Sequence, residues 1–180
     1  MPIHISHAHS QHATDLFAVV TYKIPGLFPE DRQTSKINSV SAAWLGSCQK
    51  TPLLFYALML SSSVHLDIVR LSKFTGDSPK ILSYKQTIFR ILSEIIREGD
   101  DTSRDEVILA IFTLSSHEIM PLIEEKRTPF KSPLKKLQFL NIYGSIQFVP
   151  EHMKACLELI ESKGGIEKIQ LPGLAECLVG

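Results

Sequence analysis

A chain of 180 residues in which 44% are hydrophobic and 21% charged has the composition of an ordinary soluble globular protein. The length corresponds to one domain with room for a substantial core. The formal net charge of zero excludes a general electrostatic attraction to nucleic acid or to an anionic membrane, so we expect neither direct nucleic-acid binding nor membrane association.

The three cysteines argue against a disulfide framework and against a structural zinc site. Their number is odd and no two stand at CxxC spacing: Cys48, Cys156 and Cys177. We expect no metal and no cofactor. The N-terminus lacks the charged stretch and apolar core of a secretory signal, and the longest fully apolar run, Leu53–Leu60, is too short to cross a bilayer. These features predict an intracellular protein, nuclear or cytoplasmic.

Residues 1–40 are polar and irregular, so we predict a loosely ordered N-terminal arm before a helical domain at residues 41–180. The arm carries four closely spaced histidines: His4, His7, His9 and His12. Such imidazoles could bind zinc, nickel or copper, but no cysteine and no rigid scaffold accompanies them. We interpret them as part of a solvated tail.

The first helix of the domain is predicted to start at Thr51-Pro52, where a capping residue precedes a proline at the first helical position. It continues to about Lys73. Its first half is apolar all round, which predicts a place at the centre of the core. The small side chains of Ala57 and Ser61 allow a neighbouring helix to approach closely.

Two further helices have similar start signals. Ser78-Pro79 opens a helix whose apolar residues recur at helical spacing until Gly99. Ser103–Glu106 has the pattern of a capping box with an acidic first turn. The nearly all-apolar stretch behind it should form a buried helix that ends before Pro121.

Proline and glycine divide the rest of the chain. Residues 121–134 hold three prolines and predict a loop, and residues 137–143 predict a short helix. Pro150 starts an amphipathic helix that Gly164 ends, and residues 171–179 form a last helical turn or two. No segment alternates with the period of a strand. The fold class is therefore all-α, an antiparallel helical bundle of about five to seven helices.

Four stretches of the domain occur in a characteristic order. They are Trp44-Leu45-Gly46 before Pro52–Arg70, then Tyr84–Ile96, Ser103–Glu118, and finally Asn141–His152 with Gly164-Gly165 and Leu171–Leu174. In this order they resemble the front part of the regulatory, non-DNA-binding domain of fungal-specific transcription factors. The resemblance covers about residues 41–180.

The resemblance implies a regulatory domain without its usual neighbour. Members of this family contact DNA through an N-terminal cluster of six cysteines that bind zinc, and this chain has no such cluster. The family's domain usually continues with further helices, whereas this chain stops at Gly180. Helices that would pack on the missing part leave an apolar face, and we expect a homodimer to cover it.

Several polar residues are candidates for acid–base chemistry. His65 follows Ser61 by one helical turn, on the same face, and Asp67 is nearby. Glu118 could orient a histidine or act as an acid. The other candidates are His152 and Tyr143. For each of them a structural role is the alternative interpretation, and for His65 the resemblance favours it.

An apolar ligand pocket is a second kind of candidate site. Six residues are predicted to line it: Trp44, Phe55, Tyr56, Ser61, Tyr84 and Phe112. Aromatic residues at helical spacing are also ordinary core residues, and that alternative stays open. The basic residues between 126 and 136 adjoin two glutamates and lack interleaved aromatics, so we interpret them as a solvated loop.

Two functions from different classes follow. The first is a transcription-factor-like regulatory or interaction module that binds a protein partner or an apolar small effector, without its own DNA-binding domain. The alternative is a cofactor-free enzyme of fungal secondary metabolism, a cyclase, isomerase or dehydratase acting on an apolar substrate in a helical cavity. No motif of nucleotide, dinucleotide, serine-hydrolase or zinc-protease chemistry occurs in the chain.

Overall fold

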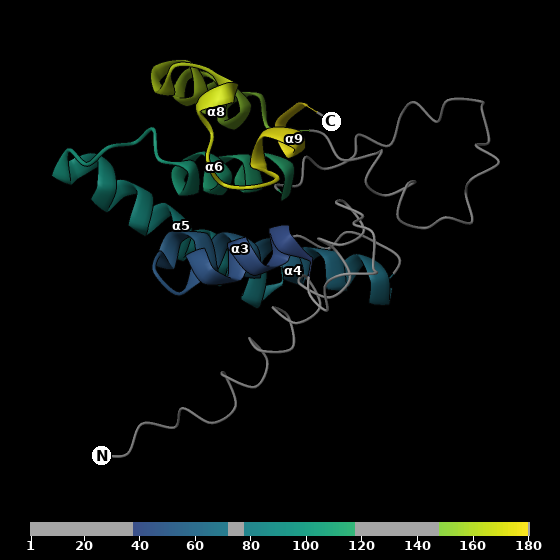
Figure 1. Cartoon of the computed structure of the whole chain (residues 1–180). Helices are drawn as coiled ribbons and strands as arrows, with labels where there is room; N and C mark the ends of the chain where they lie inside the picture. Colours follow the sequence, from purple (N-terminus) through teal and green to yellow (C-terminus); the bar gives the residue numbers. More distant parts are fainter. Residues whose placement is uncertain (1–37, 72–77, 118–147, 180) are drawn as a thin grey trace, which may run out of the picture.

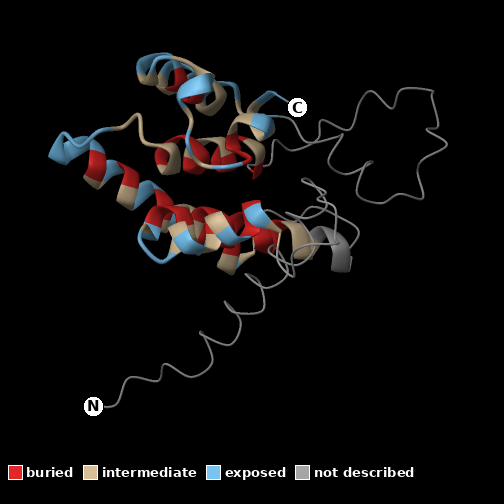
Figure 2. Cartoon of the chain, in the orientation of Figure 1, coloured by how far each residue is buried: buried red, intermediate tan, exposed pale blue. Residues whose placement is uncertain are grey.

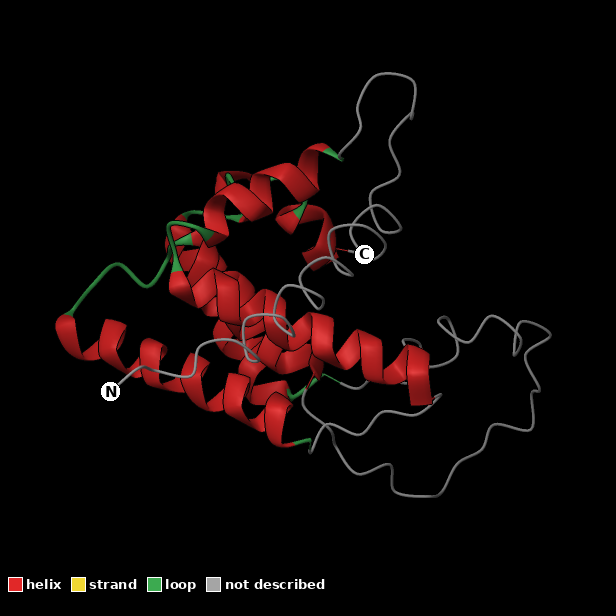
Figure 3. Ribbon diagram, turned by 90° about the horizontal axis from the view of Figure 1, so that it is seen from below, coloured by secondary structure: helices red, strands yellow, loops and turns green. Residues whose placement is uncertain are grey.

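The structure is a computed structural model that describes residues 38–71, 78–117 and 148–179. These residues form helices joined by loops, without a strand among them (Figure 3). The described helices are α3 (Ser39–Cys48), α4 (Pro52–Leu71), α5 (Pro79–Glu98), α6 (Asp105–His117), α8 (Pro150–Lys163), the short 3-10 helix η2 (Ile166–Lys168) and α9 (Leu174–Val179). The predicted all-α class is confirmed, and the described ranges alone hold six α-helices, which agrees with the five to seven expected.

Helix α6 lies between α4 on one side and α8 on the other (Figure 1). Helices α3 and α5 pack on α4, and α9 packs on α6. The buried side chains therefore form two clusters that share α4 and α6. Figure 2 marks where the buried residues lie along the helices. One cluster joins α4, α5 and α6, and the other joins α3, α4, α6, α8 and α9.

Helix α4 occupies the centre of the core, as its apolar sequence predicts. Almost every side chain from Leu53 to Val64 is buried. Ala57 of α4 and Ala110 of α6 are fully buried, and their small size lets the two helices approach closely. No helix in the described ranges is both long enough and apolar enough to traverse a lipid bilayer.

The predicted helix boundaries of α5 and α8 are confirmed. The Ser78 side chain accepts a hydrogen bond of 3.3 Å from the backbone N–H of Ile81 and caps α5. Gly99 ends α5 with a φ of 71°, and Gly164 ends α8 with a φ of 97°. Glycine adopts these left-handed angles without steric cost, which explains both stops.

Two features at helix starts differ from the sequence-based expectation. The prediction of a capping box at Ser103–Glu106 is wrong, because α6 begins at Asp105. The Ser103 hydroxyl donates instead to Asp101 Oδ1 at 2.6 Å. Helix α3 was not predicted, because it has no marked amphipathic pattern and contains Gly46. Asn38 caps it, so it starts within the predicted arm.

The end of α6 and the residues just before α8 lie close together. The backbone N–H of Val149 donates to the carbonyl of Ser115 at 3.0 Å, and Phe148 and Phe112 lie with their ring centroids 5.9 Å apart. The described residues on the two sides of 118–147 are thus in direct contact, and the predicted loop and predicted short helix fall between them in the sequence. That segment itself lies outside the described residues.

We expect that residues 118–147 can be replaced by a flexible linker of about six glycine and serine residues without loss of the fold. By loop-closure entropy alone, a connection shortened about fivefold costs only about 1.4 kcal/mol less to close. The helical circular dichroism signal of the remaining helices and cooperative thermal unfolding should persist. A deletion variant that no longer unfolds cooperatively would show that the segment contributes to the core.

Candidate functional site

The outer face of α5 carries a row of exposed apolar side chains. Leu82, Phe89 and Ile96, named here the α5 row, follow one another at intervals of seven residues. Their exposed fractions are 48%, 42% and 69%. Seven residues are close to two helical turns, so the three side chains lie along one side of the helix.

The position of the α5 row follows from the buried face of the same helix. Each of its members comes one residue after a buried isoleucine: Ile81, Ile88 and Ile95. One residue corresponds to a rotation of about 100° around an α-helix. The buried isoleucines pack in the cluster with α4 and α6, and the α5 row therefore lies beside this contact instead of within it.

The rim of the α5 row is polar. Four polar residues lie within about 90° of the row on the helix circumference, by the rotation of about 100° per residue: Lys85, Gln86, Ser93 and Arg97. Leu92 also lies within this range, on the side that turns into the core, and is buried. Across the other edge, the Phe89 ring lies 6.1 Å from the ring of His152, in the first turn of α8. An apolar centre inside a polar rim is the usual anatomy of a protein-binding surface.

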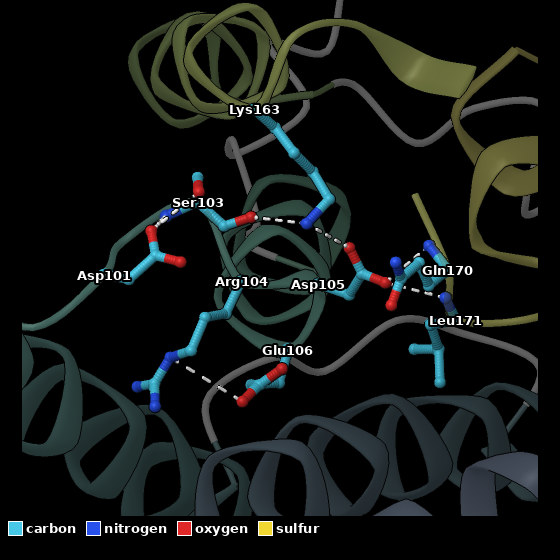
Figure 4. Close-up of polar contacts among 8 residues, drawn as sticks. All are labelled: Asp101, Ser103, Arg104, Asp105, Glu106, Lys163, Gln170 and Leu171. Atoms are coloured by element: carbon cyan, nitrogen blue, oxygen red, sulfur yellow. Dashed lines mark hydrogen bonds and ion pairs between the residues drawn. The ribbon is translucent and has the colours of Figure 1, made fainter. Parts of the chain in front are cut away.

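A polar junction ties α6 to the C-terminal part of the chain (Figure 4). Asp105 Oδ2 accepts hydrogen bonds of 2.7 Å from the backbone N–H groups of Gln170 and Leu171. Its Oδ1 lies 3.0 Å from the ammonium of Lys163, which also donates to the Ser103 carbonyl at 3.0 Å. One carboxylate therefore joins the start of α6, the end of α8 and the turn before α9.

The electrostatics of this junction suit both helices. Asp105 stands in the first turn of α6 and Lys163 in the last turn of α8, where the helix dipoles favour a negative and a positive charge respectively. The two side chains are only 12% and 18% exposed, so water screens them little. Nearby, the side-chain and backbone hydrogen bonds from Ser103 hold the pKa of Asp101 below its ordinary value.

An open cleft of about 260 Å³ adjoins the junction. Its lining mixes polar and apolar groups and comes from the α3–α4 connection, the start of α6 and the turn before α9: Ser47, Lys50, Thr51, Leu54, Asp105, Glu106, Gln170, Leu171 and Pro172. Asp105 is held there by its partners in the junction. None of the six residues predicted to line an apolar pocket borders this cleft.

A buried serine–histidine contact joins α4 to α6. Ser61 Oγ lies 3.3 Å from His117 Nε2, and His117 Nδ1 lies 2.9 Å from the Thr113 carbonyl oxygen. A carbonyl only accepts, so Nδ1 donates to it, and in the neutral ring Nε2 accepts from the Ser61 hydroxyl. A nucleophile and its base have this arrangement, but both side chains are buried in the core. We therefore assign the contact to holding the two helices together.

The three predicted acid–base residues that the structure describes lie on two helices. His65 and Asp67 are half-buried in the second half of α4, and His152 is half-buried in the first turn of α8. Helix α8 packs on α6, which separates it from α4 (Figure 1). Glu118 and Tyr143 lie outside the described residues. Ser61 and His65 lie four residues apart on α4, as predicted, and Ser61 Oγ also contacts His117 Nε2 of α6 at 3.3 Å, a contact that the sequence did not predict.

Five of the six residues predicted to line an apolar pocket are distributed over the two core clusters. Phe55, Tyr56 and Tyr84 pack in the cluster of α4, α5 and α6, with ring centroids 5.4 Å apart for the first two and 6.3 Å apart for the two tyrosines. Trp44 and Phe112 belong to the other cluster. The Trp44 indole N–H donates to the Pro172 carbonyl at 2.6 Å, which fixes the turn before α9 on α3.

The thiols of Cys48 and Cys156 are largely surrounded by protein atoms and are poorly ionised. Burial raises the pKa of Cys48 to about 12 and that of Cys156 to about 11. The reactive form of a cysteine is the thiolate, so these two cysteines are inert near neutral pH. Within residues 38–71, 78–117 and 148–179, no three potential ligands among His, Cys, Asp and Glu stand close enough to hold a metal ion. The four N-terminal histidines lie outside these ranges.

Sequence reasoning missed the α5 row, although a signal for it was present. Apolar doublets recur every seven residues: Ile81-Leu82, Ile88-Phe89 and Ile95-Ile96. A helix with a single buried face needs only the first member of each doublet, and the second member marks another apolar surface. For the junction no such signal exists, because the partners of Asp105 are 58 to 66 residues away along the chain.

Comparison with known proteins adds no relative. No family model, no curated protein and no solved structure matches the chain.

Proposed function

We propose that this chain is a regulatory or interaction module that acts by binding another protein on the α5 row. The observation that carries the proposal is the set of three large apolar side chains, Leu82, Phe89 and Ile96, that remain exposed in a regular line on one helix. Isolated exposed apolar residues are ordinary in soluble proteins. A line of three with helical register is the pattern by which one helix receives another.

The shape of the surface favours a protein over a small molecule. Fourteen residues separate Leu82 from Ile96, which corresponds to about 21 Å along the helix axis. A small apolar effector needs a concave site that covers most of its surface, whereas the side of a helix is convex. A second helix laid along the row can contact all three side chains at once. The proposed role agrees with the resemblance of residues 41–180 to a transcription-factor regulatory domain.

A pair of charge substitutions tests this function. Phe89→Glu places a carboxylate at the centre of the α5 row, and Leu157→Glu makes the same kind of change on α8, where Leu157 is 54% exposed. Both variants should fold, since both positions are exposed. Immobilised wild-type protein and both variants are incubated with extract of the cells that produce the chain, and each retained protein is purified and titrated by calorimetry.

We expect a protein, or further copies of the chain, to bind wild type and Leu157→Glu equally and Phe89→Glu at least tenfold more weakly. One carboxylate buried at the centre of an apolar contact without a partner is enough for such a loss. The proposal fails when every binding partner, including the chain itself, has the same affinity for all three proteins.

A further inference from the structure

We propose that the partner on the α5 row is a second copy of this chain, packed antiparallel, with Phe89 on the twofold axis. This inference rests on the proposed function and names its partner. A twofold interface brings the same surface of both copies together, so that surface must be complementary to itself. The α5 row meets this requirement through its spacing.

The row is symmetric about its middle residue. Leu82 stands seven residues before Phe89 and Ile96 stands seven residues after it. When two such helices lie antiparallel, Leu82 of each copy faces Ile96 of the other and the two Phe89 rings meet between them. Aliphatic side chains of similar size thus face one another on both sides of an aromatic pair.

The charges on the rim favour the antiparallel arrangement over the parallel one. The rim of the row carries two basic residues, Lys85 and Arg97. In a parallel pair each of them would face the same residue of the other copy, and like charges would come together at both positions, although each Arg97 guanidinium also lies 3.5 Å from Glu98. In the antiparallel pair Lys85 faces Ser93 and Arg97 faces the Ile81 turn. The two helix dipoles are then also opposed, which is favourable.

The expected contact is weak and reversible. A half-exposed large apolar side chain leaves about 100 Å² accessible, so two rows together bury on the order of 600 Å² of apolar surface. Stable complexes bury roughly 1,200–2,000 Å² in total. We therefore expect a dimer whose dissociation constant lies on the order of 10–100 μM, which changes with protein concentration.

Single cysteines in the full chain test the geometry through disulfide formation. Phe89→Cys should form a dimer on oxidation by copper phenanthroline. Neither Leu82→Cys nor Ile96→Cys should do so alone, because each is about 21 Å from its own copy in the antiparallel pair. A mixture of these two variants should form the mixed dimer. Wild type, with its three native cysteines, and Leu157→Cys on α8 are the controls and should remain monomeric on non-reducing gels.

Sedimentation equilibrium between about 5 and 500 μM, a range that spans the expected dissociation constant, provides an independent readout. The weight-average mass of wild type and of Leu157→Glu should rise toward twice the monomer mass, and that of Phe89→Glu should stay at the monomer. Phe89→Ala, which keeps the helix former and removes the ring, should weaken the dimer at least fivefold. Circular dichroism checks that each variant is folded.

Three outcomes overturn the inference. Wild type that remains monomeric at every concentration excludes the second copy, and self-linked Leu82→Cys and Ile96→Cys indicate a parallel pair. Equal dimerisation of Phe89→Glu places the contact elsewhere. When the chain does not dimerise through the α5 row but a different protein binds wild type and binds Phe89→Glu more weakly, the proposed function stands. Only the second copy is then excluded as the partner. When no protein of either kind depends on Phe89, both proposals fall.

Discussion

Asp105→Ala is expected to lower the free energy of unfolding by about 3 kcal/mol, because breaking a largely buried ion pair leaves uncompensated polar groups. The substitution removes the acceptor for two backbone N–H groups and the partner of the Lys163 ammonium in one step. For a chain of 180 residues this corresponds to a fall of roughly 6–12 °C in Tm. Urea unfolding followed by circular dichroism measures the effect.

Two control variants separate the parts of this effect. Asp105→Asn keeps an oxygen acceptor but removes the charge, and we expect a loss of about 1–2 kcal/mol. Glu94→Ala breaks the ion pair with Arg90 on the surface of α5, where both side chains are well exposed, and should change stability by less than about 0.5 kcal/mol. An Asp105→Ala variant as stable as Glu94→Ala would show that the junction contributes little.

Ile88→Ala is the second substitution with a large expected effect. The Ile88 side chain is fully buried between α5 and its neighbours in the cluster of α4 and α6. Removing its outer carbons loses hydrophobic burial and leaves a cavity that the close packing of α4, α5 and α6 cannot fill, with a cost of about 3–4 kcal/mol. The midpoint of urea unfolding should fall accordingly, with an unchanged slope.

The matched control lies on the same helix. Ile96→Ala is the same chemical change at a residue that directly follows the buried Ile95 and whose own side chain is 69% exposed. Its cost to the unfolding of the monomer should stay within about 0.5 kcal/mol when measured at low micromolar concentration. Ile88→Ala should leave the surface of the α5 row intact. We therefore expect Ile88→Ala to lower stability without weakening self-association, and Ile96→Ala to weaken self-association without lowering stability. Equal losses of stability would contradict the assigned burial.

Local signals in the sequence predict a helix well where both a start signal and a stop signal are present. Helix α5 begins and ends where Ser78-Pro79 and Gly99 predict, because the cap and the left-handed glycine act within one turn. The start of α6 differs because Asp101 competes for the Ser103 hydroxyl, and a short-range pattern cannot rank two acceptors. Helix α3 has a cap but no clear apolar face, and its burial against α4 is a tertiary effect.

The candidate sites depend on contacts that the sequence does not encode locally. Ser61 and His117 are 56 residues apart, and their pairing follows from the crossing of α4 and α6. The α5 row could have been predicted, since its apolar doublets repeat along one helix. The exposure of the row could not have been predicted, because the same doublets could also be buried between two other helices of a larger core.

The position of α6 has a consequence for how the molecule opens. Val107 and Ala110 belong to one buried cluster, and Ile108 and Leu109 belong to the other. A fluctuation that frees α6 must therefore disrupt both clusters together, which couples them into one cooperative unit. Amide hydrogens in the middle of α6 should exchange with solvent only through global opening, while those of α9 exchange through small local motions at the edge of the bundle.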